Sequence, residues 1–241
     1  MTVVLSANFR ILTEESMEVQ SFVYSEKSSG ENACDLTLDP NTANYKLILS
    51  EGNQMVTHRE EQMYPDLPER FDPLPQVLCR EALTGRCYWE VELSITEGTD
   101  TAAAVCYKTV ERKRDGVLCG FGWNTISWSL GHKWEPNPTF YAEHDGVTNK
   151  YPVPPAGCPR LGVFLDWPAG TLSYYIVSFN KLSDIHTFRT KFSEPVFPAF
   201  KCCSQDRLTQ DRDKTKTFRV QDQVKTKTEG GRDRDKTKTS A

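Results

Sequence analysis

Short apolar segments recur through residues 34–203, and proline or glycine separates them from one another. The clearest, YWEVEL (88–93), alternates with a period of two and places Trp89, Val91 and Leu93 on one face and two glutamates on the other. No stretch of this region sustains the 3.6-residue period of an amphipathic helix. A parallel sheet would need crossover helices. The pattern therefore predicts an all-β chain, folded as an antiparallel sandwich of two sheets.

Further segments fit the same sandwich. In SWSL, Trp128 and Leu130 alternate with two serines, and Gly170 lies in a turn that joins two apolar strands as a hairpin. The expected strands besides 88–93 cover residues 101–107, 127–130, 160–167, 171–177, 184–189 and 195–200. From this alternation we assign to the structural core Trp89, Val91, Leu93, Trp128, Leu161, Val163 and Leu165.

Two appendages flank the sandwich. Residues 1–33 form an N-terminal extension, for which a short docking helix starting at the N-cap Thr13 and a disordered arm are both open. Residues 204–241 hold only five apolar residues and repeat the string RDKTKT, with 11 Lys and Arg against seven Asp and Glu. Such a low-complexity tail buries too little apolar surface to offset its ordering entropy, so it is predicted to be disordered.

Charge and cysteine usage restrict the classes of partner and compartment. The net charge is −4, which excludes a basic nucleic-acid-binding protein on bulk charge. No run of 18 apolar residues occurs, so membrane insertion is not expected, and MTVVLSANFR lacks the features of a secretory signal. The eight cysteines include no C-x-x-C pair, which favours reduced thiols and a cytoplasmic protein.

Searches for catalytic signatures return nothing. The chain holds no G-x-S-x-G, no G-x-x-x-x-G-K-[ST] and no G-x-G-x-x-G, and its Cys and His residues do not have the spacing of zinc ligands. We therefore expect no enzymatic activity, no cofactor and no metal.

Several motifs resemble one known family when they are read in order. DLTLDPNTAN (35–44) resembles the opening of a PRY segment, and residues 64–93 resemble the passage from PRY to SPRY with its WEVE strand. LGVFLDWPAGTLSYYIVS (161–178) resembles the SPRY hairpin, and EPVFPAF (194–200) the stretch near the end of that domain. These sequence motifs are most similar to those in the PRY-SPRY domains of fish tripartite-motif proteins, NOD-like receptors and stonefish-type toxins.

The resemblance covers residues 34–203 and implies a bent SPRY-like sandwich of the concanavalin-like jelly-roll type. It implies a non-catalytic domain that binds other proteins through loops at one edge, with innate immune sensing or regulation as the setting. The RING, B-box and coiled coil of tripartite-motif proteins have no counterpart in the sequence, so ubiquitin-ligase activity is not carried over.

The sequence departs from the family after Phe200. Family members run through a turn into a last strand, whereas this chain reads KCCSQDRLTQDRDK and enters the repeat tail. The final strand is therefore expected to be missing or replaced. An unpaired sheet edge would then offer a route to self-association.

A segment of aromatic residues among proline, glycine and asparagine (131–151) is the predicted binding loop, because aromatic side chains supply contact area at low entropic cost. A charged loop, KTVERKRDG (108–116), could steer an acidic partner. The candidate partner-binding residues are Ser127, Ser129, Trp134, Phe140, Tyr141, His144, Arg112, Lys113 and Arg114.

Two other functions stay open at this point. Lectins use similar sandwiches. Asp145 and Asn149, close to Tyr141 in the sequence, supply a few of the groups that a calcium or sugar site needs. The chain could also be a truncated fragment without independent function, given the missing last strand.

Overall fold

The computed structural model describes residues 2–6, 36–93, 98–113, 117–135, 137–154, 160–178 and 181–204. The chain divides into a unit of residues 1–204 and a unit of residues 205–241, and every described residue belongs to the first. The predictions of a helix from Thr13 and of a disordered tail fall outside the described residues.

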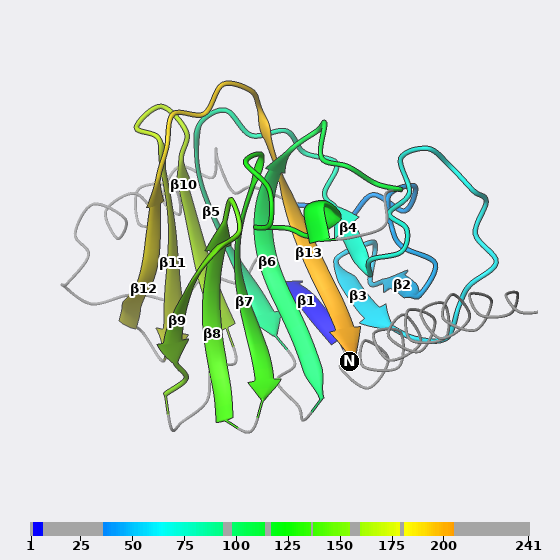
Figure 1. Ribbon diagram of the computed structural model, residues 1–241, viewed down its shortest axis with the longest axis horizontal. Helices are drawn as coiled ribbons and strands as arrows, with labels where there is room; N and C mark the ends of the chain where they lie inside the picture. The colour runs from blue at the N-terminus through cyan, green and yellow to red at the C-terminus, as the bar shows by residue number, and fades with distance from the viewer. Residues whose placement is uncertain are drawn as a thin grey trace, which may run out of the picture. The chain divides into compact units, whose positions relative to one another are not determined.

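The described residues form two antiparallel sheets (Figure 1). The seven-stranded sheet has the order β12-β11-β10-β5-β1-β3-β2, with β12 (Lys181–Arg189), β11 (Thr171–Ser178), β10 (Arg160–Asp166), β5 (Arg86–Leu93), β1 (Thr2–Ser6), β3 (Met55–His58) and β2 (Leu47–Ser50). The six-stranded sheet has the order β4-β13-β6-β7-β8-β9, with β4 (Gln76–Leu78), β13 (Val196–Ser204), β6 (Thr99–Tyr107), β7 (Ser127–Glu135), β8 (Asn137–His144) and β9 (Val147–Pro152). A short 3₁₀ turn, η1 (Val117–Cys119), precedes β7. The predicted all-β antiparallel sandwich is confirmed.

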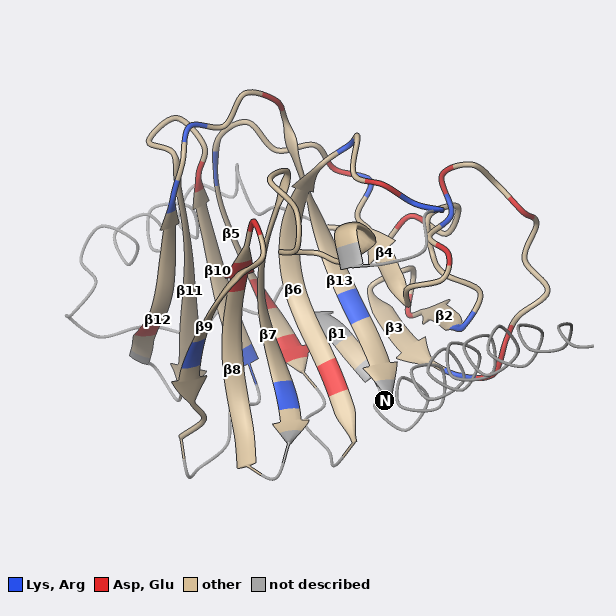
Figure 2. Ribbon diagram, viewed as in Figure 1, with Lys and Arg blue, Asp and Glu red and all other residues tan. Residues whose placement is uncertain are grey.

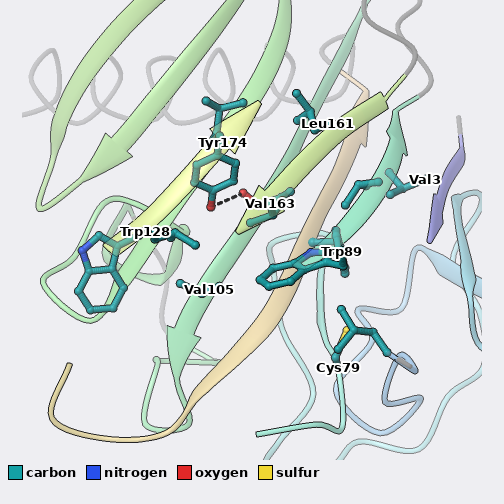
Figure 3. Packing of buried hydrophobic residues seen from close by; sticks show 14 of the residues in the cluster. Val3, Cys79, Trp89, Val105, Trp128, Leu161, Val163 and Tyr174 are labelled. Carbon is teal, nitrogen blue, oxygen red and sulfur yellow. Dashed lines mark hydrogen bonds between the residues drawn. The ribbon is translucent and has the colours of Figure 1, made fainter. Parts of the chain in front are cut away.

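The core lies between the two sheets, where alternate side chains of both pack together (Figure 3). Across this layer the Tyr174 hydroxyl of β11 donates to the Ala103 carbonyl of β6 at 3.2 Å. Trp128 packs edge-on against Tyr107 and Phe192, with ring centroids 5.5 and 5.2 Å apart. The residues assigned to the core from sequence all lie in this cluster: Trp89, Val91, Leu93, Trp128, Leu161, Val163 and Leu165.

The hairpin between β10 and β11 depends on Gly170. This residue has a φ of 70°, and a Cβ atom there would lie 1.9 Å from the Thr190 carbonyl oxygen. The carboxylate of Asp166 accepts a hydrogen bond from the Ala169 amide at 2.9 Å and so caps the turn. The hairpin turn predicted at this glycine is therefore confirmed, and its left-handed backbone is one that glycine adopts readily.

The first residues of the chain belong to the sandwich. Thr2–Ser6 form β1, which lies between β5 and β3 with Val3 opposite both Leu93 and Val56. For these residues the expectation of a helical or disordered extension is wrong. TVVL is rich in β-branched side chains, which favour a strand once partner strands are available.

The strand expected over residues 195–200 is present as β13, and any further strand after Ser204 lies outside the described residues, so the missing or replaced final strand stays a prediction. β13 continues past Phe200 to Ser204 and pairs on both sides, with β4 and with β6. The open edges of the described sheets are β12, β2, β4 and β9. Self-association through an unpaired edge remains a prediction.

Besides β1, five of the described strands were not predicted from the sequence. β2, β3 and β4 are only three or four residues long, which is too short for a period to be recognised. β8 and β9 come from the segment expected to be an aromatic loop, and they form a hairpin that extends the sheet from β7. The expectation of a loop over residues 131–151 is therefore wrong.

The cysteines do not all share one state. Cys87 is disulfide-bonded, which contradicts the expectation of reduced thiols for this residue. Five others are buried thiols that form no disulfide: Cys79, Cys106, Cys119, Cys202 and Cys203. Within the described ranges, no helix has the length and apolar character that a membrane crossing requires.

Candidate functional site

The outer face of the six-stranded sheet combines a buried polar cluster with exposed apolar side chains. Its middle is built from small residues, with Ala102 and Ala104 of β6 opposite Gly131 and Ser129 of β7. The strands that form and flank this floor carry charged residues, and Figure 2 shows their positions along the ribbon in red on β6 and β8 and in blue on β13, β7 and β9. A floor of small residues lets longer side chains lie flat across it.

Tyr141, Asp100 and Lys201 form a connected polar cluster on this floor. The Tyr141 ring lies over Gly131, where a Cβ atom would come within 2.4 Å of the phenolic oxygen. Its hydroxyl donates to one carboxylate oxygen of Asp100, and Lys201 Nζ donates to the other at 2.7 Å. The cluster is largely buried, with Asp100 at 5% exposure and Tyr141 at 8%.

The ionisation of this cluster follows from burial and pairing. Burial raises the pKa of the Tyr141 phenol, so it stays protonated and acts as a donor. Burial alone would lower the pKa of Lys201, but the adjacent Asp100 carboxylate overrides this and the pKa is raised. The cluster is therefore a neutral phenol and an ion pair that satisfy one another, an arrangement suited to holding strands in place.

Residues 117–124 cover the upper part of the same face. The Gly122 amide donates to the Ser127 hydroxyl at 2.8 Å, and the Ser129 hydroxyl donates to the Phe121 carbonyl at 3.3 Å. The Gly146 amide of the β8–β9 turn donates to the Gly122 carbonyl at 3.2 Å. The segment is thus fixed both to β7 and to the neighbouring turn.

This fixed segment presents an exposed apolar group. Leu118, Trp123 and Val147 are 56%, 40% and 63% exposed, and we call these three residues the Trp123 surface. The Trp123 indole Nε1 donates to the Glu143 carboxylate at 3.1 Å, and Thr148 donates to the other oxygen of that carboxylate at 3.0 Å. Burial raises the pKa of Glu143, while these two hydrogen bonds act in the opposite direction. The indole is therefore held in one orientation while part of it faces solvent.

Three predicted contact residues are buried. Ser127, Ser129 and Phe140 each have 0% exposure. The serines hold the covering segment, and Phe140 points into the core between the sheets. As residues that touch a partner directly, these three predictions are wrong, because alternation along a strand does not show what covers its outer side.

The other predicted aromatic residues are partly or wholly enclosed. Tyr141 belongs to the buried cluster, and Trp134 is half-buried near the end of β7. His144 stacks on Trp128 with centroids 4.7 Å apart, and its Nδ1 lies 2.8 Å from the Ser127 carbonyl oxygen. These residues do not gather into one exposed surface.

The predicted basic loop packs beside the covering segment, since Val110 and Phe121 share one hydrophobic cluster with Phe71. The Arg112 guanidinium packs over the Phe71 ring at 4.4 Å and donates to the Lys108 carbonyl at 3.1 Å. Lys113 forms an ion pair with Asp66 at 2.5 Å. Both cations thus have partners within the chain, and Arg114 lies outside the described residues.

Trp123 was not among the residues predicted from the sequence to contact a partner. Its local sequence, GFGWN, matches no catalytic or binding motif. The two glycines and the asparagine around this tryptophan favour a turn rather than a strand, so its side chain is not expected on the inner face of a sheet. That combination is the signal that could have identified it.

A sugar or calcium site finds no support at the residues considered for it. Asn149 pairs opposite Ala142, which points into the core layer, whereas Tyr141 lies on the other side of the sheet. Within the described ranges, no three His, Cys, Asp or Glu side chains are grouped so that they could hold a metal ion.

Comparison with known proteins places these features in a family. A sequence model of the SPRY-associated domain (PRY) matches residues 36–83, and a model of the SPRY domain matches residues 86–210. The chain is 42% identical over 170 residues to the neoverrucotoxin subunit alpha of Synanceia verrucosa, covering 70% of this chain and 23% of that protein. It is 40% identical over 171 residues to tripartite motif-containing protein 16 of Mus musculus, covering 70% of this chain and 29% of that protein.

A solved structure agrees with these matches. The crystal structure of the TRIM65 PSpry domain superposes with a TM-score of 0.60 at 29% identity, covering 70% of this chain and 90% of that one. The chain spans about a quarter of the length of the two curated relatives. The two domain matches and the sandwich they occupy show that the chain belongs to the SPRY family, with a PRY segment preceding the SPRY domain.

Proposed function

We propose that this chain is a non-catalytic protein-recognition module and that it binds its partner through the Trp123 surface. The relatives in tripartite-motif proteins support a role in protein interaction. The observation that carries the choice of surface is the exposed indole of Trp123, held by Glu143 in an orientation fixed before any partner arrives. A rigid aromatic side chain loses little entropy on binding, which is why tryptophan dominates many binding surfaces.

The neighbourhood of Trp123 adds to this argument. Leu118 and Val147 are further exposed apolar residues on segments that hydrogen-bond to residues next to Trp123, Leu118 through Asn124 and Val147 through the adjacent Gly146. Hydrogen bonds to Ser127, Ser129 and Gly146 hold the supporting loop in place. The Asp100–Lys201 ion pair is buried below and does not compete with the apolar contact. We expect the partner to be a protein or peptide that places an apolar side chain against Trp123 and polar side chains around that contact.

The test uses a random peptide library displayed on phage and selected against the full chain. The selected peptides are then titrated against wild type, Trp123→Ala and Met63→Ala. Met63 is a matched control because it is a large, fully exposed apolar side chain in another loop. We expect Trp123→Ala to weaken binding at least tenfold and Met63→Ala to leave it unchanged. Peptides that bind all three proteins equally would refute the choice of surface.

We also propose that the setting of this recognition is innate immune sensing or regulation, which rests on the family resemblance. The test measures the transcript of this chain in cells of the source organism before and after exposure to double-stranded RNA. Induction is expected, and an unchanged transcript with unchanged protein level would count against the proposal.

A further inference from the structure

The position of β1 in its sheet is a second feature that suggests binding, and it is separate from the Trp123 surface. β1 pairs with β5 on one side and with β3 on the other, so it joins β12-β11-β10-β5 to β3-β2. Without it, β5 and β3 would each lose a neighbour and the seven-stranded sheet would be divided. We call the place between β5 and β3 the β1 slot.

The β1 slot has the properties of a strand-binding site. Antiparallel pairing on both sides offers rows of backbone donors and acceptors to any extended segment. The position of one buried side chain also fixes the register in which a strand can pair with β5 and β3. Val3 is 1% exposed and lies in the core cluster together with Leu93 and Val56, so the segment must carry an apolar residue at that point. A shift by one residue would turn this side chain to the wrong face.

The strand that fills the slot is not part of a hairpin. Both partner strands are far from β1 in sequence, since it pairs with residues 55–57 and 90–93. Residues 7–35 separate Ser6 from the next described residue, Leu36. β1 is thus held in the slot by its own pairing and by the burial of Val3, and by no short turn to a neighbouring strand.

We propose that the β1 slot also accepts β1 from a second copy of this chain, so that two copies exchange these strands reciprocally. The identity of the occupant follows from the structure, because the chain's own β1 shows that TVVLS fits the slot and every copy carries the same strand. Exchange of an identical element keeps every contact of the slot and needs no new surface. The product is a closed dimer in which each copy completes the sheet of the other.

The chain's own strand competes with this exchange. A strand tethered to its own slot has an effective concentration of about a millimolar, so dilute protein keeps β1 in place. Exchange is therefore expected when wild-type β1 is released from its own slot, as in mild denaturant, while the protein is concentrated.

The first experiment uses the full chain and a labelled peptide with the sequence of residues 1–9, which stands for the strand of a second copy. Val3→Asp in the full chain places a charge in the core cluster and expels the chain's own strand. We expect the peptide to bind the Val3→Asp chain at least tenfold more tightly than wild type. A peptide that itself carries Val3→Asp is expected not to bind.

A matched control separates an open slot from general loss of stability. Leu182 is 4% exposed and lies in a different cluster, on the outer side of the seven-stranded sheet, so Leu182→Ala weakens the fold without touching β1. This variant should bind the peptide no better than wild type. If Val3→Asp does not fold alone, the peptide should restore its folded spectrum, and the milder Val3→Ala gives a second open slot. Equal binding to all variants, or no binding and no restoration, would overturn the proposal.

The second experiment measures the exchange itself. Wild-type chain is incubated in mild denaturant at high concentration, refolded, and sized by light scattering. A dimer whose fraction rises with the concentration during incubation is expected, and it should be absent for Val3→Asp. A monomer at every concentration, or a dimer that forms equally with Val3→Asp, would contradict strand exchange.

Discussion

The inner face of the six-stranded sheet and the middle of its outer face are both buried, but they are built differently. The inner face packs apolar and aromatic side chains such as Trp128 and Leu130 against the opposite sheet. The outer face has a floor of alanine and glycine, a buried phenol and an ion pair, and a loop that covers its upper part. Large apolar side chains of this covering loop, Trp123 and Leu118, reach solvent.

The difference separates stability from recognition. Side chains of the inner face have no access to a partner, so their contribution is to the free energy of unfolding. The outer face serves both purposes. The Asp100 cluster links neighbouring strands and contributes to stability, whereas the covering loop exposes Trp123 to a partner. Comparing variants on the two faces tests whether that division is real.

The largest expected change in stability comes from replacing a tryptophan of the inner face, and it should far exceed the change from replacing Trp123. Trp128→Ala removes a side chain that is 2% exposed and packed against three rings, so we expect a loss of about 3–5 kcal/mol in the free energy of unfolding. Trp123→Ala removes a side chain that is 40% exposed and should cost less than about 1 kcal/mol. Urea unfolding of both variants provides the measurement. Similar losses would erase the proposed division between the faces.

The next effect tests the buried ion pair. Asp100→Ala leaves the Lys201 ammonium without its carboxylate, and we expect a loss of about 2–4 kcal/mol because a mostly buried charge is left unpaired. The double variant Asp100→Leu with Lys201→Met removes both charges and should recover much of that loss. Chemical denaturation of the two variants decides the matter; a double variant as unstable as the single one would show that the pair itself supplies the stability.

A smaller effect concerns the small-residue floor. Gly131→Ala places a methyl group within 2.3 Å of the Tyr141 ring, so the ring must move away from Asp100. We expect a loss of about 1–3 kcal/mol from this overpacking. Ala102→Gly at the opposite position on β6 serves as the control, since it only removes a methyl group. Thermal unfolding of Gly131→Ala at the wild-type temperature would show that the ring does not depend on the glycine.

The smallest expected change in stability comes from a buried histidine of the inner face. His132 is 0% exposed, and neither ring nitrogen has a hydrogen-bond partner among the residues that the structure describes. Burial lowers the pKa of His132, opposed by the Asp100 charge, so the folded state favours the neutral ring. Stability should therefore be lost as the pH falls below the ordinary histidine pKa of about 6.5.

His132→Phe tests this reasoning. The variant removes unbonded polar atoms from the core, so at pH 7.5 it should be as stable as wild type or up to about 1 kcal/mol more stable. Between pH 7 and pH 5 its stability should decline less than that of wild type. His186, whose pKa burial also lowers, leaves a residual slope in both proteins. Parallel urea titrations at several pH values provide the comparison, and equal slopes would show that His132 is not the sensitive group.

The inner face could be predicted well from the sequence because alternation is a local property. Trp89, Trp128 and Val163 are assigned directly from a period of two along their strands, and the hairpin turn is recognised from Gly170. β1 could not be predicted in the same way, since a lone TVVL segment becomes a strand only when distant β5 and β3 are brought to it. The candidate site was missed for a related reason: whether Ser129 or Trp123 faces solvent depends on a covering loop that no periodicity describes.

The most direct test of the central claim follows the indole signals of the five tryptophans in a nitrogen–proton NMR spectrum. A phage-selected peptide is added to the full chain, and Trp123→Phe assigns the signal of interest. The account predicts that the Trp123 signal shifts on binding while the signals of the core residues Trp89 and Trp128 stay in place. A binding peptide that leaves the Trp123 signal unmoved would contradict the proposal that recognition occurs at this surface.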